Sequence, residues 1–135
     1  MLAPLAAMAW GLWIGRRAVD LPRLALVGAW MCYAYFMLSV QVHESHFYMI
    51  VPLLSLAAVS LPAWRQLFWL LSAMFSLNLN LSLFYGFGDR AGFATPRTLT
   101  VIDATAWLSI ANVAVFIWFG RRLRRCLDGP SPAFT

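Results

Sequence analysis

The sequence predicts an all-α protein, a polytopic bundle of about five transmembrane helices. Of its 135 residues, 62% are hydrophobic and only 11% are charged. A soluble domain averages about 25% charged residues, because polar side chains must cover its surface. Apolar stretches recur along the chain, and most approach the ~20 residues that span a bilayer. All ten basic residues are arginines that gather at the ends of these stretches, a pattern typical of membrane proteins and not of nucleic-acid binding.

The first two predicted spans flank a short polar connection. Leu2–Ile14 carries Pro4 near its start, where a helix tolerates proline, and it ends before two arginines. The Arg16–Arg23 loop contains an aspartate and a proline, and the second span, Leu24–Val42, follows it. Its roughly eighteen residues give a helix of about 27 Å, enough to cross the hydrocarbon core of a bilayer.

The other three predicted spans are separated by connections of different lengths. The end of Phe47–Trp64 is marked by Pro62, because proline does not continue a helix, and by the polar pair Arg65-Gln66 that follows. Leu67–Tyr85 follows, and the Gly86–Thr100 loop after it is the longest polar connection, with three glycines. The last span, Val101–Phe119, ends at a cluster of arginines.

Small polar residues alternate with leucines in the fourth predicted span. On a helix they form two pairs four residues apart, Ser76 with Asn80 and Asn78 with Ser82. Such pairs share a helix face. They would bond to a neighbouring helix or to a sugar hydroxyl, and the first use is the more common one in membranes. We therefore expect hydrogen bonds between helices here.

The arginines predict the orientation of the bundle. Five alternating spans leave Arg90 and Arg97 on one side of the membrane and eight arginines on the other. The positive-inside rule makes the second side cytoplasmic, so the N-terminus is expected outside and the C-terminus inside. His43–His46 and the Gly86–Thr100 loop then face a periplasm or a lumen, in a bacterial inner membrane or an endoplasmic reticulum. The cytoplasmic arginines are Arg16, Arg17, Arg23, Arg65, Arg121, Arg122, Arg124 and Arg125.

The most concentrated polar feature is His43-Glu44-Ser45-His46, between the second and third spans. On a helix, His43 and His46 would share one face. A histidine can donate to a phosphate or carry a proton near neutral pH, and a neighbouring carboxylate can orient it or act as a base. The same residues would also serve as a simple helix cap in the headgroup region.

A metal site is a further interpretation of this cluster. Zinc takes three or four ligands in fixed geometry, and two imidazoles with one carboxylate would need Asp89 or Asp103 as well. No spacing supports either aspartate, so we expect neither a metal nor another cofactor. Asp103, near the start of the fifth span, is instead expected to cap that helix.

The string from Gln41 to Leu54, QVHESHFYMIVPLL, resembles a motif of the GT-C superfamily of membrane glycosyltransferases. That superfamily includes dolichyl-phosphate-glucose-dependent glucosyltransferases and prokaryotic mannosyltransferase-like proteins. Its members carry a V-H-E-x-x or H-E-x-H string on the outer face, which runs into an apolar helix with an early proline. His43 and Glu44 match that string, His46 matches the prokaryotic variant, and the Pro-Leu-Leu at 52–54 matches the helix.

The resemblance implies an inverting transfer of a hexose, such as mannose or glucose, from a polyprenyl-phosphate carrier on the outer face. It places His43 near the donor phosphate, with Glu44 and His46 orienting the donor or the acceptor. His43 and Glu44 are thus the predicted catalytic residues. Arg90 and Arg97 are the further predicted substrate-binding residues, because a guanidinium can contact phosphate in bidentate fashion; the alternative is that they belong to an ordinary solvated loop. The implied partners are the lipid bilayer and the polyprenyl-phosphate-linked sugar.

Enzymes of that superfamily have longer chains, with an acidic residue in a first outer loop near the N-terminus. Here the only acidic residue before Glu44 is Asp20, on the predicted cytoplasmic side. Residues 1–135 are therefore expected to form a single transmembrane domain, the C-terminal part of such an enzyme. A missing N-terminal part or a partner subunit would complete it.

Two other functions compete with glycosyl transfer. In a transporter or proton-relay subunit, the cluster His43–His46 would pass protons, but a relay also needs ionisable groups deep inside several spans. A small structural membrane protein without catalysis would not need the His-Glu pair.

The orientation is testable by cysteine labelling in intact membranes. In a Cys32→Ala background, Ser45→Cys is expected to react with an impermeant maleimide from the outer side only, because the arginine count places it there. Native Cys126, which follows the arginine cluster, is the matched internal control and should react only after the membrane is opened. Labelling of Ser45→Cys from the cytoplasmic side would overturn the predicted orientation.

Overall fold

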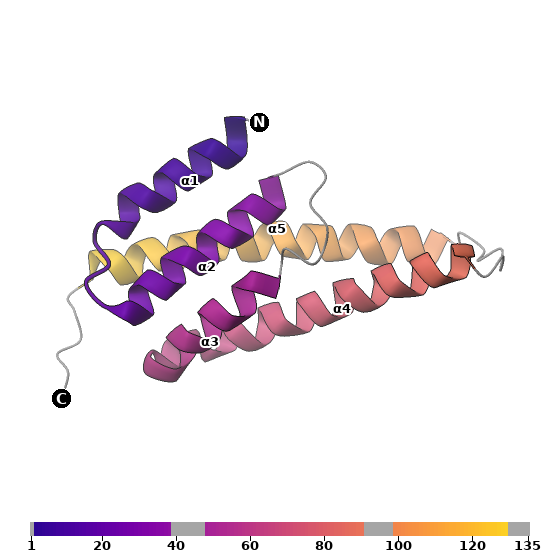
Figure 1. The fold of residues 1–135 in the computed structure, drawn as a ribbon. Helices are drawn as coiled ribbons and strands as arrows, with labels where there is room; N and C mark the ends of the chain where they lie inside the picture. The colour runs from indigo at the N-terminus through magenta and orange to yellow at the C-terminus, as the bar shows by residue number, and fades with distance from the viewer. Residues whose placement is uncertain (1, 39–47, 91–98, 130–135) are drawn as a thin grey trace.

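The structure is a computed structural model that describes the backbone of residues 2–38, 48–90 and 99–129 and, within these ranges, the side chains outside 81–106. The described residues form five α-helices, joined by the short 3₁₀ helix η2 and other connections, with no β-strand among them, so the all-α prediction is confirmed (Figure 1). In chain order the elements are α1 (Leu2–Gly15), α2 (Leu21–Leu38), α3 (Ile50–Ser60), η2 (Pro62–Trp64), α4 (Arg65–Arg90) and α5 (Leu99–Asp128).

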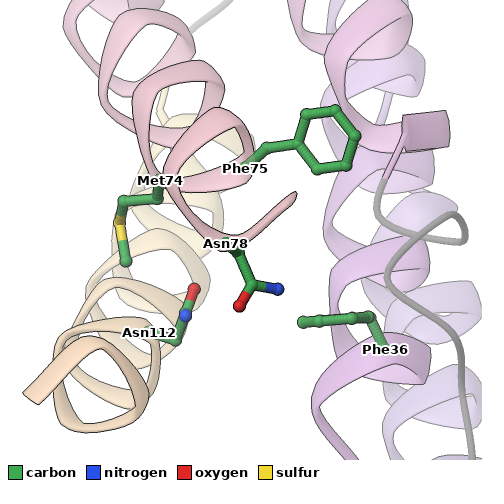
Figure 2. A pocket seen from close by; sticks show the side chains of 5 residues that line it. All are labelled: Phe36, Met74, Phe75, Asn78 and Asn112. Atoms are coloured by element: carbon green, nitrogen blue, oxygen red, sulfur yellow. The ribbon is translucent and has the colours of Figure 1, made fainter. Parts of the chain in front are cut away.

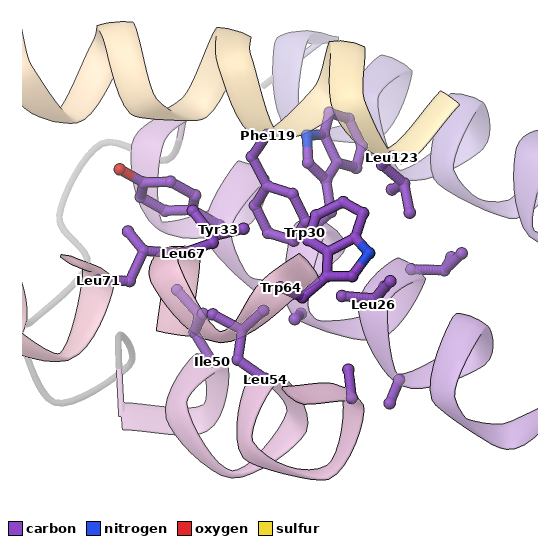
Figure 3. Close-up of a cluster of buried hydrophobic side chains, with 14 of the residues drawn as sticks. Leu26, Trp30, Tyr33, Ile50, Leu54, Trp64, Leu67, Leu71, Phe119 and Leu123 are labelled. Carbon is purple, nitrogen blue, oxygen red and sulfur yellow. The ribbon is translucent and has the colours of Figure 1, made fainter. Parts of the chain in front are cut away.

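Helix α2 lies at the centre of the bundle and packs against α1, α3 and α5, while α4 packs mainly against α3. The core forms around α2, where Leu26 and Tyr33 are completely buried. Figure 3 shows how Ile50, Leu54 and Phe119 from neighbouring helices converge on these residues. Burying a large apolar side chain contributes about 1.5–3 kcal/mol in water. In lipid, close packing has to replace much of that driving force.

The start of α2 is fixed by Asp20. Its carboxylate oxygen Oδ1 accepts a hydrogen bond of 2.8 Å from the backbone N–H of Arg23, and Oδ2 lies 3.6 Å from Arg23 Nε. An aspartate at this position satisfies one of the N–H groups that a helix start leaves free. Pro22 fits the first turn, where no N–H is needed. Helix α2 therefore begins at Leu21, before the predicted Leu24.

The third predicted span is interrupted at Leu61. Helix α3 covers only Ile50–Ser60, and Leu61 has φ −121° and ψ 86°, outside the helical region. A residue before proline is pushed away from helical geometry, and Pro62 therefore ends the helix. The turn η2 then redirects the chain into α4. The eleven residues of α3 are fewer than the ~20 that a membrane crossing needs.

Helices α4 and α5 are longer than predicted. The segment Gly86–Arg90 is helical, so the expected Gly86–Thr100 loop is too long. Each added residue of a helix gains a backbone hydrogen bond, which extends it past the apolar stretch. Helix α5 begins at Leu99 and continues beyond Phe119 to Asp128. Arginine and leucine are good helix formers, so the arginine cluster prolongs this helix.

The outer faces of all five helices carry exposed apolar side chains. Among the described residues, α2 is the helix that combines the length and the apolar composition needed to cross a membrane, and α1 and α3 are apolar but shorter. Soluble monomers seldom expose broad apolar patches. Examples from the five helices in order are Leu12, Leu24, Val59, Trp69 and Ile110.

Two glycines on α1 allow it to approach α2 closely. A Cβ atom on Gly11 would lie 2.6 Å from Met31 Cγ, and one on Gly15 would lie 3.1 Å from Val27 Cγ1. The two glycines are four residues apart and share a helix face. Small residues at this spacing let helix backbones come together in membranes, so the pair fixes how α1 packs.

Gly11 and Gly28 form a matched test of this close approach. A Cβ on Gly28 would make an ordinary 3.4 Å contact with Leu53 Cδ1. Alanine improves helix propensity by about 1 kcal/mol at both positions, but only at Gly11 does it collide with a neighbour. Gly11→Ala is expected to have a free energy of unfolding about 1–3 kcal/mol lower than Gly28→Ala, measured by denaturation in detergent micelles. Equal stability would mean that Met31 moves aside without cost.

Candidate functional site

Most of the predicted site lies outside the described residues. This is true of His43, Glu44, His46 and Arg97. Arg90 is the last residue of α4, and its side chain also lies outside the description. The described helix ends nevertheless determine where these chain segments attach to the bundle.

The C-terminal ends of α2 and α4 and the starts of α3 and α5 all lie toward the same end of the bundle, but α4 and α5 extend farther along it (Figure 1). The Tyr48 ring, next to the first of these segments, lies 6.1 Å from the Phe75 ring of α4. Arg90 follows Phe75 by fifteen residues, or about 22 Å along the helix. The start of α3, which follows the segment with His43, therefore lies far from the C-terminal end of α4, which precedes the segment with Arg97.

The opposite end of the bundle gathers eight arginines. They lie at or beside the C-terminal ends of α1, α3 and α5 and the N-terminal ends of α2 and α4. Contacts between distant parts of the chain show that these ends are neighbours in space. Arg17 forms an ion pair and a hydrogen bond with Asp128, and Arg124 Nε lies 3.6 Å from the other oxygen of that carboxylate. We call this end the arginine end; it comprises Arg16, Arg17, Arg23, Arg65, Arg121, Arg122, Arg124 and Arg125.

Two of these arginines bind backbone carbonyl groups at the corner between α3 and α4. Arg65 Nε donates to the carbonyl of Ala58 at 3.2 Å, and Arg122 donates to the carbonyl of Ala63 at 2.6 Å. The last carbonyls of a helix lack partners within it, and cationic side chains can satisfy them. The same Arg122 guanidinium lies 5.2 Å from the ring centroids of Trp64 and Trp118, a cation–π arrangement that joins α5 to this corner.

A buried polar cluster joins α2 to α5. The Tyr33 hydroxyl lies 2.9 Å from both the backbone carbonyl and the side-chain Oδ1 of Asn112, and it donates to these acceptors. Asn112 Nδ2 in turn donates to the carbonyl of Leu108 at 3.1 Å. Tyr33 is completely buried and Asn112 is 8% exposed. Low-dielectric surroundings strengthen such bonds and make their loss costly.

Asn78 of α4 lies beside this cluster (Figure 2). It lines a small gap together with Phe36, Met74, Phe75 and Asn112, and the gap leaves no room for a water molecule. The side chains shown in Figure 2 are neutral, so they can hydrogen-bond but carry no charge. The arrangement therefore holds α2, α4 and α5 together and is not a ligand cavity.

The structure changes the expectation for the Ser76–Asn80 pair. Asn80 Nδ2 donates to the carbonyl of Ser76 at 2.7 Å, and both side chains are exposed. The predicted bond between helices is thus wrong for this pair within the described residues, because the amide bonds back to its own helix. Ser82, the partner expected for Asn78, has a side chain outside the description.

The described residues include no group of three histidine, cysteine or carboxylate side chains that could hold a metal ion. Cys32 and Cys126 are both free thiols. The candidate ligands in His43–His46 and the side chains of Asp89 and Asp103 lie outside the description, as does the expected cap at Asp103.

No family model, curated protein or solved structure matches this chain. The resemblance to GT-C glycosyltransferases therefore rests on the residues of the 41–54 string. The described part of the chain adds the arrangement of helices around that string and the chemistry of the arginine end.

Sequence reasoning missed the bond between Tyr33 and Asn112. A signal for it was available, since Asn112 is an amide in the middle of the apolar stretch Val101–Phe119. Polar groups at such positions usually face the interior of a bundle and find a partner there. The identity of the partner depends on the packing of α2 against α5, which sequence periodicity does not give.

Tyr33→Phe tests the strength of this bond. It removes the hydroxyl, keeps the ring and leaves Asn112 Oδ1 without its donor. We expect the free energy of unfolding to fall by roughly 0.6–1.7 kcal/mol, the range for hydrogen bonds between membrane helices. Tyr48→Phe, on an exposed ring, is the control and should change stability little. A double-mutant cycle with Asn112→Ala isolates the coupling, and a coupling near zero would contradict the proposed bond.

Proposed function

We propose that the chain is a multi-spanning membrane protein whose arginine end faces the cytoplasm. One observation carries the proposal: the eight arginines of that end are neighbours in the folded chain, while exposed apolar side chains cover the outer faces of the helices. Charged groups remain at an interface because burying them in hydrocarbon is costly. Arginine-rich connections stay on the cytoplasmic side.

Within that bundle, we propose that α1 to α5 form the C-terminal membrane region of a GT-C-like glycosyltransferase. The donor would be a hexose carried by a polyprenyl phosphate, and the transfer would take place at the outer end. His43 and Glu44 are the proposed catalytic residues, with His46 binding the donor or the acceptor. The leaving group is a lipid phosphate, and a cationic hydrogen-bond donor beside it stabilises the charge that develops during transfer.

The start of α3 and the end of α4 lie at different levels along the bundle, and this supports different roles for the histidines and for Arg90 and Arg97. The segment with His43 and His46 leaves α2 and enters α3 near the level of Phe75, inside the apolar part of α4. The end of α4 at Arg90 lies about 22 Å farther along the helix. In this proposal the histidines contact the donor phosphate at the deeper level, and Arg90 and Arg97 contact parts of the donor or acceptor nearer the outer surface.

The interior of the bundle gives less support to a proton relay. The described buried polar side chains are Arg23 at the arginine end and Asn112 in the middle, and the phenol of Tyr33 bonds to Asn112. Amides do not titrate, and a chain of acidic groups or histidines is what a relay needs. A structural role without catalysis is the other alternative, and it is distinguished by the experiment below.

Substitution of His43 tests the transferase proposal directly. His43→Ala, introduced into the gene of the native host, is expected to lower hexose transfer from the polyprenyl-phosphate donor by at least about tenfold, because the developing phosphate charge loses its partner. The measurement is incorporation of radiolabelled sugar in isolated membranes.

Ser45→Ala is the matched control, since it changes the same segment without removing a proposed functional group. It should keep transfer near the wild-type level. Both variants must be present in the membrane at equal amounts by immunoblot. Unchanged transfer with His43→Ala would reject the phosphate-contact role and favour a structural protein.

A further inference from the structure

An open groove runs along α2 where α1 and α5 flank it. It has a volume of about 370 Å³, within the range of small-molecule binding sites. Three aromatic rings line it. The ring centroid of Trp30 lies 4.5 Å from that of Trp10 on α1 and 5.4 Å from that of Phe116 on α5, on which it stacks. The groove extends as far as Leu38, so it follows α2 for eight residues, or about 12 Å.

The side walls of the groove are apolar, and one end is charged. Ala7 from α1 and Ile117 from α5 contribute to the walls, and Arg121 lies at the arginine end. The side chain of Ile117, which lines the groove, is also exposed on the outside of the bundle. In a membrane, such an opening faces the lipid chains, so an aqueous ligand would have to cross them to enter it.

The arginines of this end differ in their partners. Arg17 and Arg124 pair with Asp128, and Arg65 and Arg122 bind backbone carbonyls. Arg121, like Arg16 and Arg125, has no hydrogen-bond or ion-pair partner among the described residues, but of these three it is the one that lines the groove. The two aspartates described at this end, Asp20 and Asp128, are already paired with Arg23 and with Arg17 and Arg124. The charge beside the groove is therefore available to an anion.

We propose that this groove holds one acyl chain of an anionic phospholipid, whose phosphate binds Arg121. The inference rests on the proposed membrane placement. The groove and such a lipid are complementary in chemistry. The apolar groove ends at the guanidinium of Arg121, just as an acyl chain ends at a charged headgroup. Basic residues near the cytoplasmic leaflet attract its anionic lipids. The site lies at the arginine end and is separate from the proposed sugar-transfer site at the outer end.

Native mass spectrometry of the full chain in detergent micelles, with equimolar phosphatidylglycerol and phosphatidylcholine, tests the charged end of this site. The wild type is expected to retain phosphatidylglycerol in preference. Arg121→Gln should lower that retention about fivefold, the effect of losing one basic contact near the membrane surface. Arg16→Gln removes the same charge from an exposed arginine between α1 and α2 that does not line the groove, and it should lower retention less than about twofold. Equal losses in both variants would overturn the proposal.

A second matched pair of variants tests the apolar part of the site. Ala7→Leu adds a side chain within the groove and is expected to reduce lipid retention, whereas Ala6→Leu adds it on an exposed face and should not. Unchanged retention by a folded Ala7→Leu would overturn the acyl-chain assignment. Should that variant unfold, Arg121→Gln decides the proposal alone.

Carbonate extraction of wild-type membranes separates this site from the membrane placement itself. A chain that stays in the membrane but shows no preference for phosphatidylglycerol overturns the lipid site only. A chain that carbonate removes overturns the placement and the lipid site together.

Discussion

The packing of α2 against α1, α3 and α5 is the interaction on which the other features of the bundle depend. Its faces differ in the contacts that they make. Glycines of α1 approach it closely, α3 packs leucine and isoleucine against it, and α5 adds a hydrogen bond at Tyr33. Van der Waals packing and hydrogen bonds are the main forces available between helices in lipid, where the hydrophobic effect does not favour one apolar contact over another. A central helix that uses both therefore defines the positions of its neighbours.

The side chains of the arginine end keep their charge at the end of the bundle and also provide hydrogen bonds to helix ends. Hydrocarbon excludes charge, and helix ends leave carbonyl groups without partners. Arg65 and Arg122 meet both conditions, since each guanidinium remains at the end of the bundle and donates to a carbonyl of the corner between α3 and α4. Arg17 joins the connection between α1 and α2 to the end of α5 through Asp128. These contacts at the arginine end thus hold the helices together from outside the buried apolar core.

The sequence predicts the helical class and the number of helices because apolar stretches, Pro62 and the glycine-rich connection are local signals. It misplaces the ends of α4 and α5, since helix continuation through Gly86–Arg90 and through the arginines depends on adding hydrogen bonds to an existing helix. Periodicity also gives no partner for Asn112 or Arg122, because those contacts join residues far apart in the chain. For the predicted site, the helices supply only the points at which the segments with His43 and Arg97 attach.

The bond between Tyr33 and Asn112 spans 79 positions in the chain, and the contact of Arg17 with Asp128 spans 111. During synthesis, α2 leaves the ribosome long before the helix that completes its core. Phe119 and Leu123 of α5, which are completely buried in that core, are made later. Until then the Tyr33 hydroxyl has neither of its acceptors on Asn112, and the aromatic surface around Trp30 lacks its cover from Phe116. The core around α2 therefore closes only after α5 has been made, and until then the surfaces that α5 covers stay exposed.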